Sequence, residues 1–182
     1  MLLWVAVFVL LPLALVAGFI VGVRKMAQEQ TFALPDRTGQ LTRTDEAAGP
    51  SDALEEIFAG VLDRRLDTRE AAVYERDGTP AVWITGGEGQ QSSPVRNLRE
   101  TFGRLPAPDG GSFPRRYDAE GGLVVMCGTL EADREPYPVC GWSDLGTMGF
   151  VVDLAHAGQG SMPPEYWPVL VERTKAVRAD GR

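Results

Sequence analysis

The stretch VVMCGTLEADREPYPVCGWSDLGTMGFVV, residues 124–152, carries both cysteines of the chain within a β-prone sequence. Its runs of β-branched and aromatic residues, punctuated by charged and glycine-containing turns, predict strands at 121–131, 136–143 and 147–153. Consecutive strands joined by short turns pair antiparallel. We therefore expect this stretch to form an antiparallel meander.

The spacing of the two cysteines predicts a disulfide. If Glu131 faces Pro136 across the first turn, the same register places Cys127 opposite Cys140. Opposed residues of antiparallel strands have Cα atoms about 4.5–5.5 Å apart, which a disulfide accepts. A Cys-x-x-Cys redox motif is absent, and one histidine is too few for a structural zinc site. Buried reduced thiols are the main alternative.

Helices and further strands are predicted on both sides of this meander. A buried-face spacing follows Ser51, a potential N-cap, and Asp77-Gly78 lies between two β-prone runs as in a hairpin. The other predicted elements are a helix capped by Ser93 and begun by Pro94, a strand at 113–118 and a helix at 164–177. We expect an α+β domain over 51–178, an antiparallel sheet with two or three helices on one face and the other face free.

A glycine-rich segment, residues 86–102, has the order of a phosphate-binding loop, with a strand, glycines and then a helix. It lacks the Lys-Ser/Thr of a P-loop, and Glu88 places a negative charge where a phosphate must lie. The net charge of −7 and the absence of long basic runs argue against nucleic acid as a partner. We predict neither a cofactor nor a metal ion.

Residues 2–23 form an uncharged apolar run that predicts a transmembrane helix, within an anchor of residues 1–25. A cleaved signal peptide fits less well, because no basic segment precedes the run and no clear cleavage site follows it. Membrane lipid is the expected partner of residues 2–23. Ala14, Gly18 and Gly22 offer a stripe for a weak homodimer, although glycine is common in membrane helices anyway.

Residues 26–50 mix polar residues with proline and glycine and predict a flexible tether. Two arguments then conflict over which side of the membrane the domain occupies. Arg24 and Lys25 follow the apolar run and favour a cytoplasmic domain by the positive-inside rule. A structural disulfide favours a compartment outside the reducing cytosol. Because large domains are exported largely regardless of flanking charge, we expect an extracytoplasmic domain.

Several motifs resemble a family of actinobacterial single-pass membrane or secreted proteins that has no assigned activity. The resemblance rests on Cys127-Gly128, on the Pro-x-Cys-x-Trp-x-Asp pattern at 138–144 and on the glycine-bounded strand after it. It covers roughly residues 70–178, although the family usually has alanine at the positions of Gly141 and Ser143. The resemblance implies the same fold and location, and no activity.

No catalytic site is predicted from the sequence. His156 is a candidate partner for Asp153 or Ser161, but no G-x-S-x-G motif accompanies it, and a lone histidine in such a segment is usually a surface loop residue. Asp144 is expected to cap a turn, and Trp142 is expected to pack in the core. We therefore expect a non-enzymatic, membrane-anchored binding or interaction module for an unidentified protein or envelope partner. The alternatives are an envelope enzyme or a cytoplasmic-facing signalling subunit.

Overall fold

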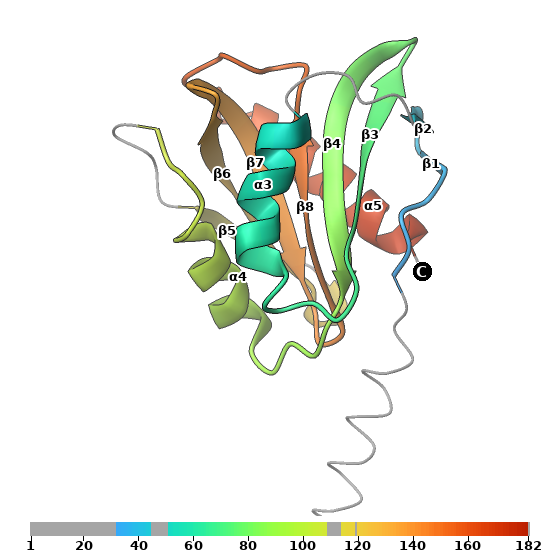
Figure 1. Cartoon of the computed structure of the whole chain (residues 1–182), viewed down its shortest axis with the longest axis vertical. Coiled ribbons are helices and arrows are strands. Elements are labelled where there is room, and N and C mark those ends of the chain that lie inside the picture. The colour runs from blue at the N-terminus through green and yellow to red at the C-terminus, as the bar shows by residue number, and fades with distance from the viewer. Residues whose placement is uncertain (1–31, 45–50, 109–113, 119, 182) are drawn as a thin grey trace, which may run out of the picture. The chain divides into compact units, whose positions relative to one another are not determined.

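The predicted meander forms three neighbouring strands of an eight-stranded antiparallel sheet in the computed structural model (Figure 1). The structure describes residues 32–44, 51–108, 114–118 and 120–181. The strand order is β1-β2-β3-β4-β8-β7-β6-β5. The strands are β1 (Arg37–Thr38), β2 (Leu41–Thr44), β3 (Glu70–Arg76), β4 (Thr79–Glu88), β5 (Arg115–Asp118), β6 (Val124–Ala132), β7 (Glu135–Ser143) and β8 (Thr147–Asp153). The α-helices in the described residues are α3 (Ser51–Leu62), α4 (Pro94–Phe102) and α5 (Tyr166–Asp180), and a 3-10 turn spans Glu120–Gly122.

Two tight hairpins fix the register of the sheet. Asp77 and Gly78 join β3 to β4 with positive φ angles of 54° and 76°, as a two-residue hairpin turn requires. Asp133 and Arg134 do the same between β6 and β7, with φ angles of 51° and 67°. The expected pairing of Glu131 with Pro136 is confirmed, and the ladder continues one pair beyond it into the turn.

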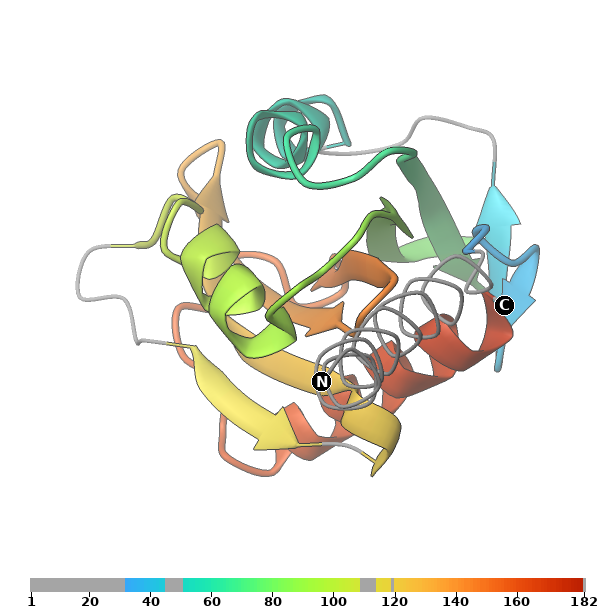
Figure 2. The ribbon, with the colours of Figure 1, turned by 90° about the horizontal axis from the view of Figure 1, so that it is seen from below.

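Helices cover both faces of the sheet, so the prediction that one face is free was wrong. Helices α3 and α4 pack on one face, and α5 packs on the other (Figure 2). Alternate residues of one strand divide between the two layers: Trp83 faces α3 and Val82 faces the layer of α5. The strand β8 is buried at every position, as is typical of a strand covered on both sides. The chain is an α+β protein with the sheet as its middle layer.

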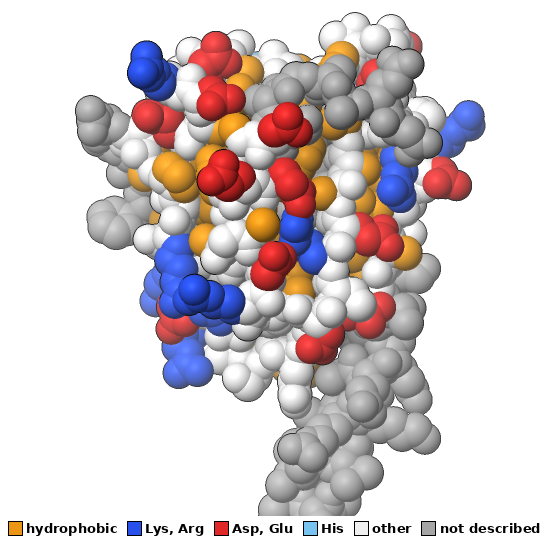
Figure 3. Space-filling model, viewed as in Figure 1, with side chains coloured by type: hydrophobic (Ala, Val, Ile, Leu, Met, Phe, Trp, Pro, Cys, Tyr) orange, Lys and Arg blue, Asp and Glu red, His pale blue; other side chains and the backbone are white. Residues whose placement is uncertain are grey.

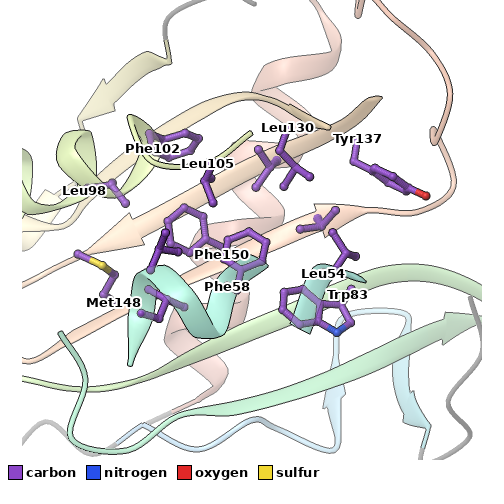
Figure 4. Close-up of a cluster of buried hydrophobic side chains, with 14 of the residues drawn as sticks. Leu54, Phe58, Trp83, Leu98, Phe102, Leu105, Leu130, Tyr137, Met148 and Phe150 are labelled. Atoms are coloured by element: carbon purple, nitrogen blue, oxygen red, sulfur yellow. The ribbon is translucent and has the colours of Figure 1, made fainter. Parts of the chain in front are cut away.

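The layer under α3 and α4 is the larger aromatic core (Figure 4). The ring of Phe58 lies 4.9 Å from that of Phe150 and 5.2 Å from that of Trp83, measured between centroids. Phe102 reaches Phe150 from α4, with centroids 5.3 Å apart. The predicted amphipathic spacing of α3 and α4 is confirmed here, because its apolar residues point into this layer. Ser93 was predicted to cap α4, but its side chain makes no capping hydrogen bond.

Part of the expected tether belongs to the folded domain. Residues 32–44 contain β1 and β2, and the side chains of Phe32, Leu34 and Leu41 are buried. The backbone N–H of Ala33 donates to the carbonyl of Gly181 at 3.0 Å, which holds the two ends of the described chain together. The prediction of a flexible tether over 26–50 was therefore wrong for 32–44, and its remaining residues lie outside the described ranges.

The predicted anchor also lies outside the described residues. Residues 2–23, with the stripe of Ala14, Gly18 and Gly22, are among those that the structure does not describe. Within the described residues, no helix has both the length and the apolar character needed to cross a bilayer. Helix α5 ends at Asp180, two residues beyond the predicted domain boundary.

Candidate functional site

The predicted disulfide is present and joins β6 and β7, the first two strands of the meander. Cys127 on β6 lies directly opposite Cys140 on β7, with Cα atoms 4.0 Å apart, and their sulfurs are bonded. The two residues are 2% and 0% exposed and lie in the layer under α5. Because the bond is covered by α5 and neighbouring strands, reductants in solution have little access to it. The bond is positioned as a structural staple.

The ring of Trp142 lies in the same layer and packs directly against two glycines. Gly86 of β4 and Gly149 of β8 are paired across the sheet, and a Cβ at either position would come within 2.8 Å of the Trp142 ring. The ring is fully buried, and its centroid lies 5.3 Å from that of Phe32. These glycines are therefore required for packing, because only a bare backbone leaves room for the indole.

Asp144 organises the turn between β7 and β8, as the sequence predicted. Its Oδ1 accepts hydrogen bonds from the backbone N–H of Gly146 at 2.9 Å and of Thr147 at 2.8 Å, and from the Thr147 hydroxyl at 3.1 Å. Its Oδ2 accepts from Nε of Arg178 at 2.7 Å. One carboxylate thus holds a turn and the last part of α5 together.

The sequence analysis did not identify Arg178 as a partner of Asp144. Its guanidinium is only 1% exposed and forms a buried ion pair, whereas we expect arginines near a helix C-terminus to be solvated. A signal was present in the sequence, because Arg178 continues the buried stripe of Leu170, Thr174 and Val177 at helical spacing. A charged residue on such a stripe indicates a buried acidic partner elsewhere in the chain.

A second aspartate, Asp153, holds the other end of α5. It is 1% exposed and accepts a 2.5 Å hydrogen bond from the hydroxyl of Tyr166 and a 3.3 Å bond from Nη1 of Arg173. Nδ1 of His156 lies 3.2 Å from its other oxygen, so the histidine contacts Asp153, a pairing that the sequence offered only as a less favoured alternative. Burial and then the bond to Asp153 raise the pKa of Tyr166 well above its ordinary value. Tyr166 therefore remains a neutral donor at ordinary pH.

The residues around Asp153 have the contacts of a structural cluster that holds α5 in place. A histidine oriented by a carboxylate is one part of a hydrolytic triad, but the triad also needs a nucleophile bonded to the other ring nitrogen. Among the described residues, His156 has Asp153 as its hydrogen-bonding partner and Tyr166 as a ring contact, with centroids 4.9 Å apart. Ser161 is exposed and is not brought into this cluster. The described residues also contain no group of His, Cys, Asp and Glu arranged to hold a metal ion.

The glycine-rich segment is packed against the domain's own backbone. A Cβ at Gly87 would lie 1.7 Å from the carbonyl oxygen of Thr68, and one at Gly89 would lie 2.3 Å from that of Arg65. The Glu88 carboxylate accepts a hydrogen bond from the N–H of Phe32 at 3.0 Å. The space that a phosphate needs is thus occupied by neighbouring chain, and packing accounts for the glycines.

Comparison with known protein families, with curated proteins and with solved structures finds no match for this chain. The resemblance based on residues 70–178 therefore stays a prediction. The chemistry of the described residues is the remaining guide to function, and its most informative feature is the disulfide.

Removing the disulfide should weaken the domain without unfolding it. The double substitution Cys127→Ala and Cys140→Ala is expected to lower the free energy of unfolding by roughly 2–4 kcal/mol, because opening a short loop restores entropy to the unfolded chain. Urea denaturation of the oxidised protein and the double variant measures the difference. Reduced wild-type protein is the matched control and should unfold close to the double variant. Equal stability of the oxidised and reduced proteins would contradict a stabilising role.

Proposed function

We propose that this protein is a single-pass, membrane-anchored binding module whose domain lies outside the cytosol. The observation that carries the proposal is the buried Cys127–Cys140 disulfide between β6 and β7. Structural disulfides form and persist in oxidising compartments and are rare in the cytosol. The uncharged run at 2–23 is the anchor that the sequence predicts.

A binding role is favoured over catalysis by how the polar side chains of the domain are used. The carboxylate oxygens of the two buried aspartates, Asp144 and Asp153, accept hydrogen bonds that hold α5 and a turn in place. Catalytic sites instead keep reactive groups converging on an accessible space. Helices cover both faces of the sheet. The surface that binds a partner therefore lies on helices, turns or sheet edges. The partner is a protein or envelope component.

Membrane topology tests the proposal directly. A reporter that is active only outside the cytosol, fused after Arg182, is expected to be active in cells. The protein should resist extraction from membranes by alkaline carbonate, whereas deletion of 2–23 should release it. The matched control is a reporter that is active only in the cytosol, fused at the same position, and it should be silent.

A cytoplasmic domain predicts the opposite pattern of reporter activity. Arg24 and Lys25 favour a cytoplasmic domain by the positive-inside rule. If the cytosolic reporter alone is active, the domain is cytoplasmic and the proposal fails. If full-length protein is released by carbonate, the anchor fails, whichever reporter is active.

A further inference from the structure

A basic patch covers α4 and the adjoining end of α3 in this otherwise acidic protein. It consists of Arg65, Arg96, Arg99 and Arg104 around Glu100. All of its cations are arginines. Nη2 of Arg65 lies 2.7 Å from Oε2 of Glu100. Arg65, Arg96 and Arg104 all lower the pKa of Glu100, so they lie near it. Figure 3 shows Lys and Arg side chains gathered over α4 at the lower left.

The patch lies toward the end of the domain at which the described chain begins. Phe32 is fixed there by its N–H bond to Glu88, the last residue of β4. The loop that continues from Glu88 leads into α4, and the carbonyl of Arg65 accepts a 3.1 Å hydrogen bond from Gln91 in that loop. Leu145, 45% exposed, is joined to the same loop through the N–H of Gln91 at 2.9 Å. An exposed apolar side chain therefore accompanies the arginines.

The chain between the predicted anchor and this end is short. Because 32–44 are folded, the connection consists of residues 24–31, which span at most about 29 Å even when fully extended. The expected tether of residues 26–50 would have allowed the domain far more distance from the membrane. A connection of this length keeps the domain within reach of the bilayer.

We propose that this end of the domain docks on the anionic phospholipid headgroups of its own membrane through the basic patch. The inference rests on the proposed function, because it requires the anchor at 2–23. The four arginines less Glu100 leave a net charge of +3, which attracts an anionic surface within about one Debye length. Leu145 adds an apolar contact at the headgroup boundary.

The charges also set the orientation of the domain. The end at which the described chain begins also carries carboxylates: Glu88 and Glu70 accept the N–H bonds of Phe32 and Leu34, and the N–H of Asp67 donates to the carbonyl of Glu88. Repulsion of Asp67 and attraction of the patch turn the α4 side toward the lipid.

A headgroup-quenching experiment tests the docking. The full chain is reconstituted in nanodiscs containing lipids with a nitroxide on the headgroup, and a thiol-reactive fluorophore is attached at Ser92→Cys. Ser92 is exposed in the loop before α4, and both native cysteines are held in the disulfide. The matched control is Thr79→Cys, exposed at the other end of β4 and about 30 Å away along the strand.

Strong quenching is expected at residue 92 and weak quenching at 79 in bilayers containing phosphatidylglycerol. The quenching at 92 should fall to the level at 79 in purely zwitterionic bilayers, in 0.5 M salt and in the Arg96→Glu, Arg99→Glu variant, whose folding is checked by circular dichroism. Equal quenching at both positions at low salt, or quenching unchanged by charge reversal, overturns the docking. If the patch instead binds an acidic protein, the quenching is equal at both positions. Failure of the full chain to remain with the nanodiscs instead refutes the anchor and hence the proposed function.

Discussion

Replacing Trp142 by alanine is expected to lower the free energy of unfolding by about 3–5 kcal/mol, as truncation of a buried aromatic residue does. The indole is 0% exposed and lies over Gly86 and Gly149, which have no side chains with which to fill the space it leaves. The loss therefore combines the transfer free energy of the ring with an uncollapsed cavity. Denaturant unfolding followed by far-UV circular dichroism measures it.

Two matched variants separate packing from the mere loss of a side chain. Trp142→Phe retains part of the ring and removes an Nε1–H that has no hydrogen-bond partner among the described residues, so it should cost less than alanine. Val169→Ala, at a position 59% exposed on α5, should change stability by less than about 0.5 kcal/mol. A loss below about 1 kcal/mol for Trp142→Ala would mean that the ring is exposed, and a surface role would become the better interpretation.

Replacing Arg178 by methionine is expected to cost about 3–5 kcal/mol, because it leaves the buried Asp144 carboxylate without its cationic partner. The effect is larger than for a surface ion pair, since the guanidinium is 1% exposed and the two groups interact away from water. Equilibrium unfolding in urea at neutral pH measures the loss. The surface pair of Lys175 with Glu172 supplies the control: Lys175→Met should cost about 1 kcal/mol or less.

A double variant identifies the cause of that loss. In Asp144→Asn with Arg178→Met, the asparagine oxygen still accepts the turn hydrogen bonds from Gly146 and Thr147, while no buried charge remains. The double variant should therefore be more stable than Arg178→Met alone. If it is less stable, by the sum of the two single effects, the residues do not interact and the buried ion pair of Asp144 with Arg178 is wrongly assigned.

The sequence predicted the local structure around β6 and β7 because its signals are local. Turn residues and alternation fixed the two hairpins, and the pairing of Glu131 with Pro136 located the disulfide. Asp144 was identified for the same reason, since its turn partners are two and three residues away. Such contacts need no knowledge of the rest of the chain.

The errors concern contacts between distant parts of the chain. Nothing in the residues after β8 specifies which face of the sheet α5 crosses, although the unbroken burial of β8 shows that a strand this apolar needs cover on both sides. The two-residue β1 and the four-residue β2 are stabilised by pairing with each other and with β3, so their own sequences are too short to predict them. Arg178 likewise gains its role from Asp144, 34 positions earlier.

The redox state of the two cysteines in living cells tests the central claim most directly, namely that the domain occupies an oxidising compartment. Cells expressing the full chain are quenched in acid, free thiols are blocked with one maleimide, and thiols released by reduction are labelled with a heavier one. The account predicts that Cys127 and Cys140 carry only the second label. A protein that carries the first label on both cysteines would contradict it, because the disulfide would then be absent where the protein resides and the flanking Arg24 and Lys25 would favour a cytoplasmic domain.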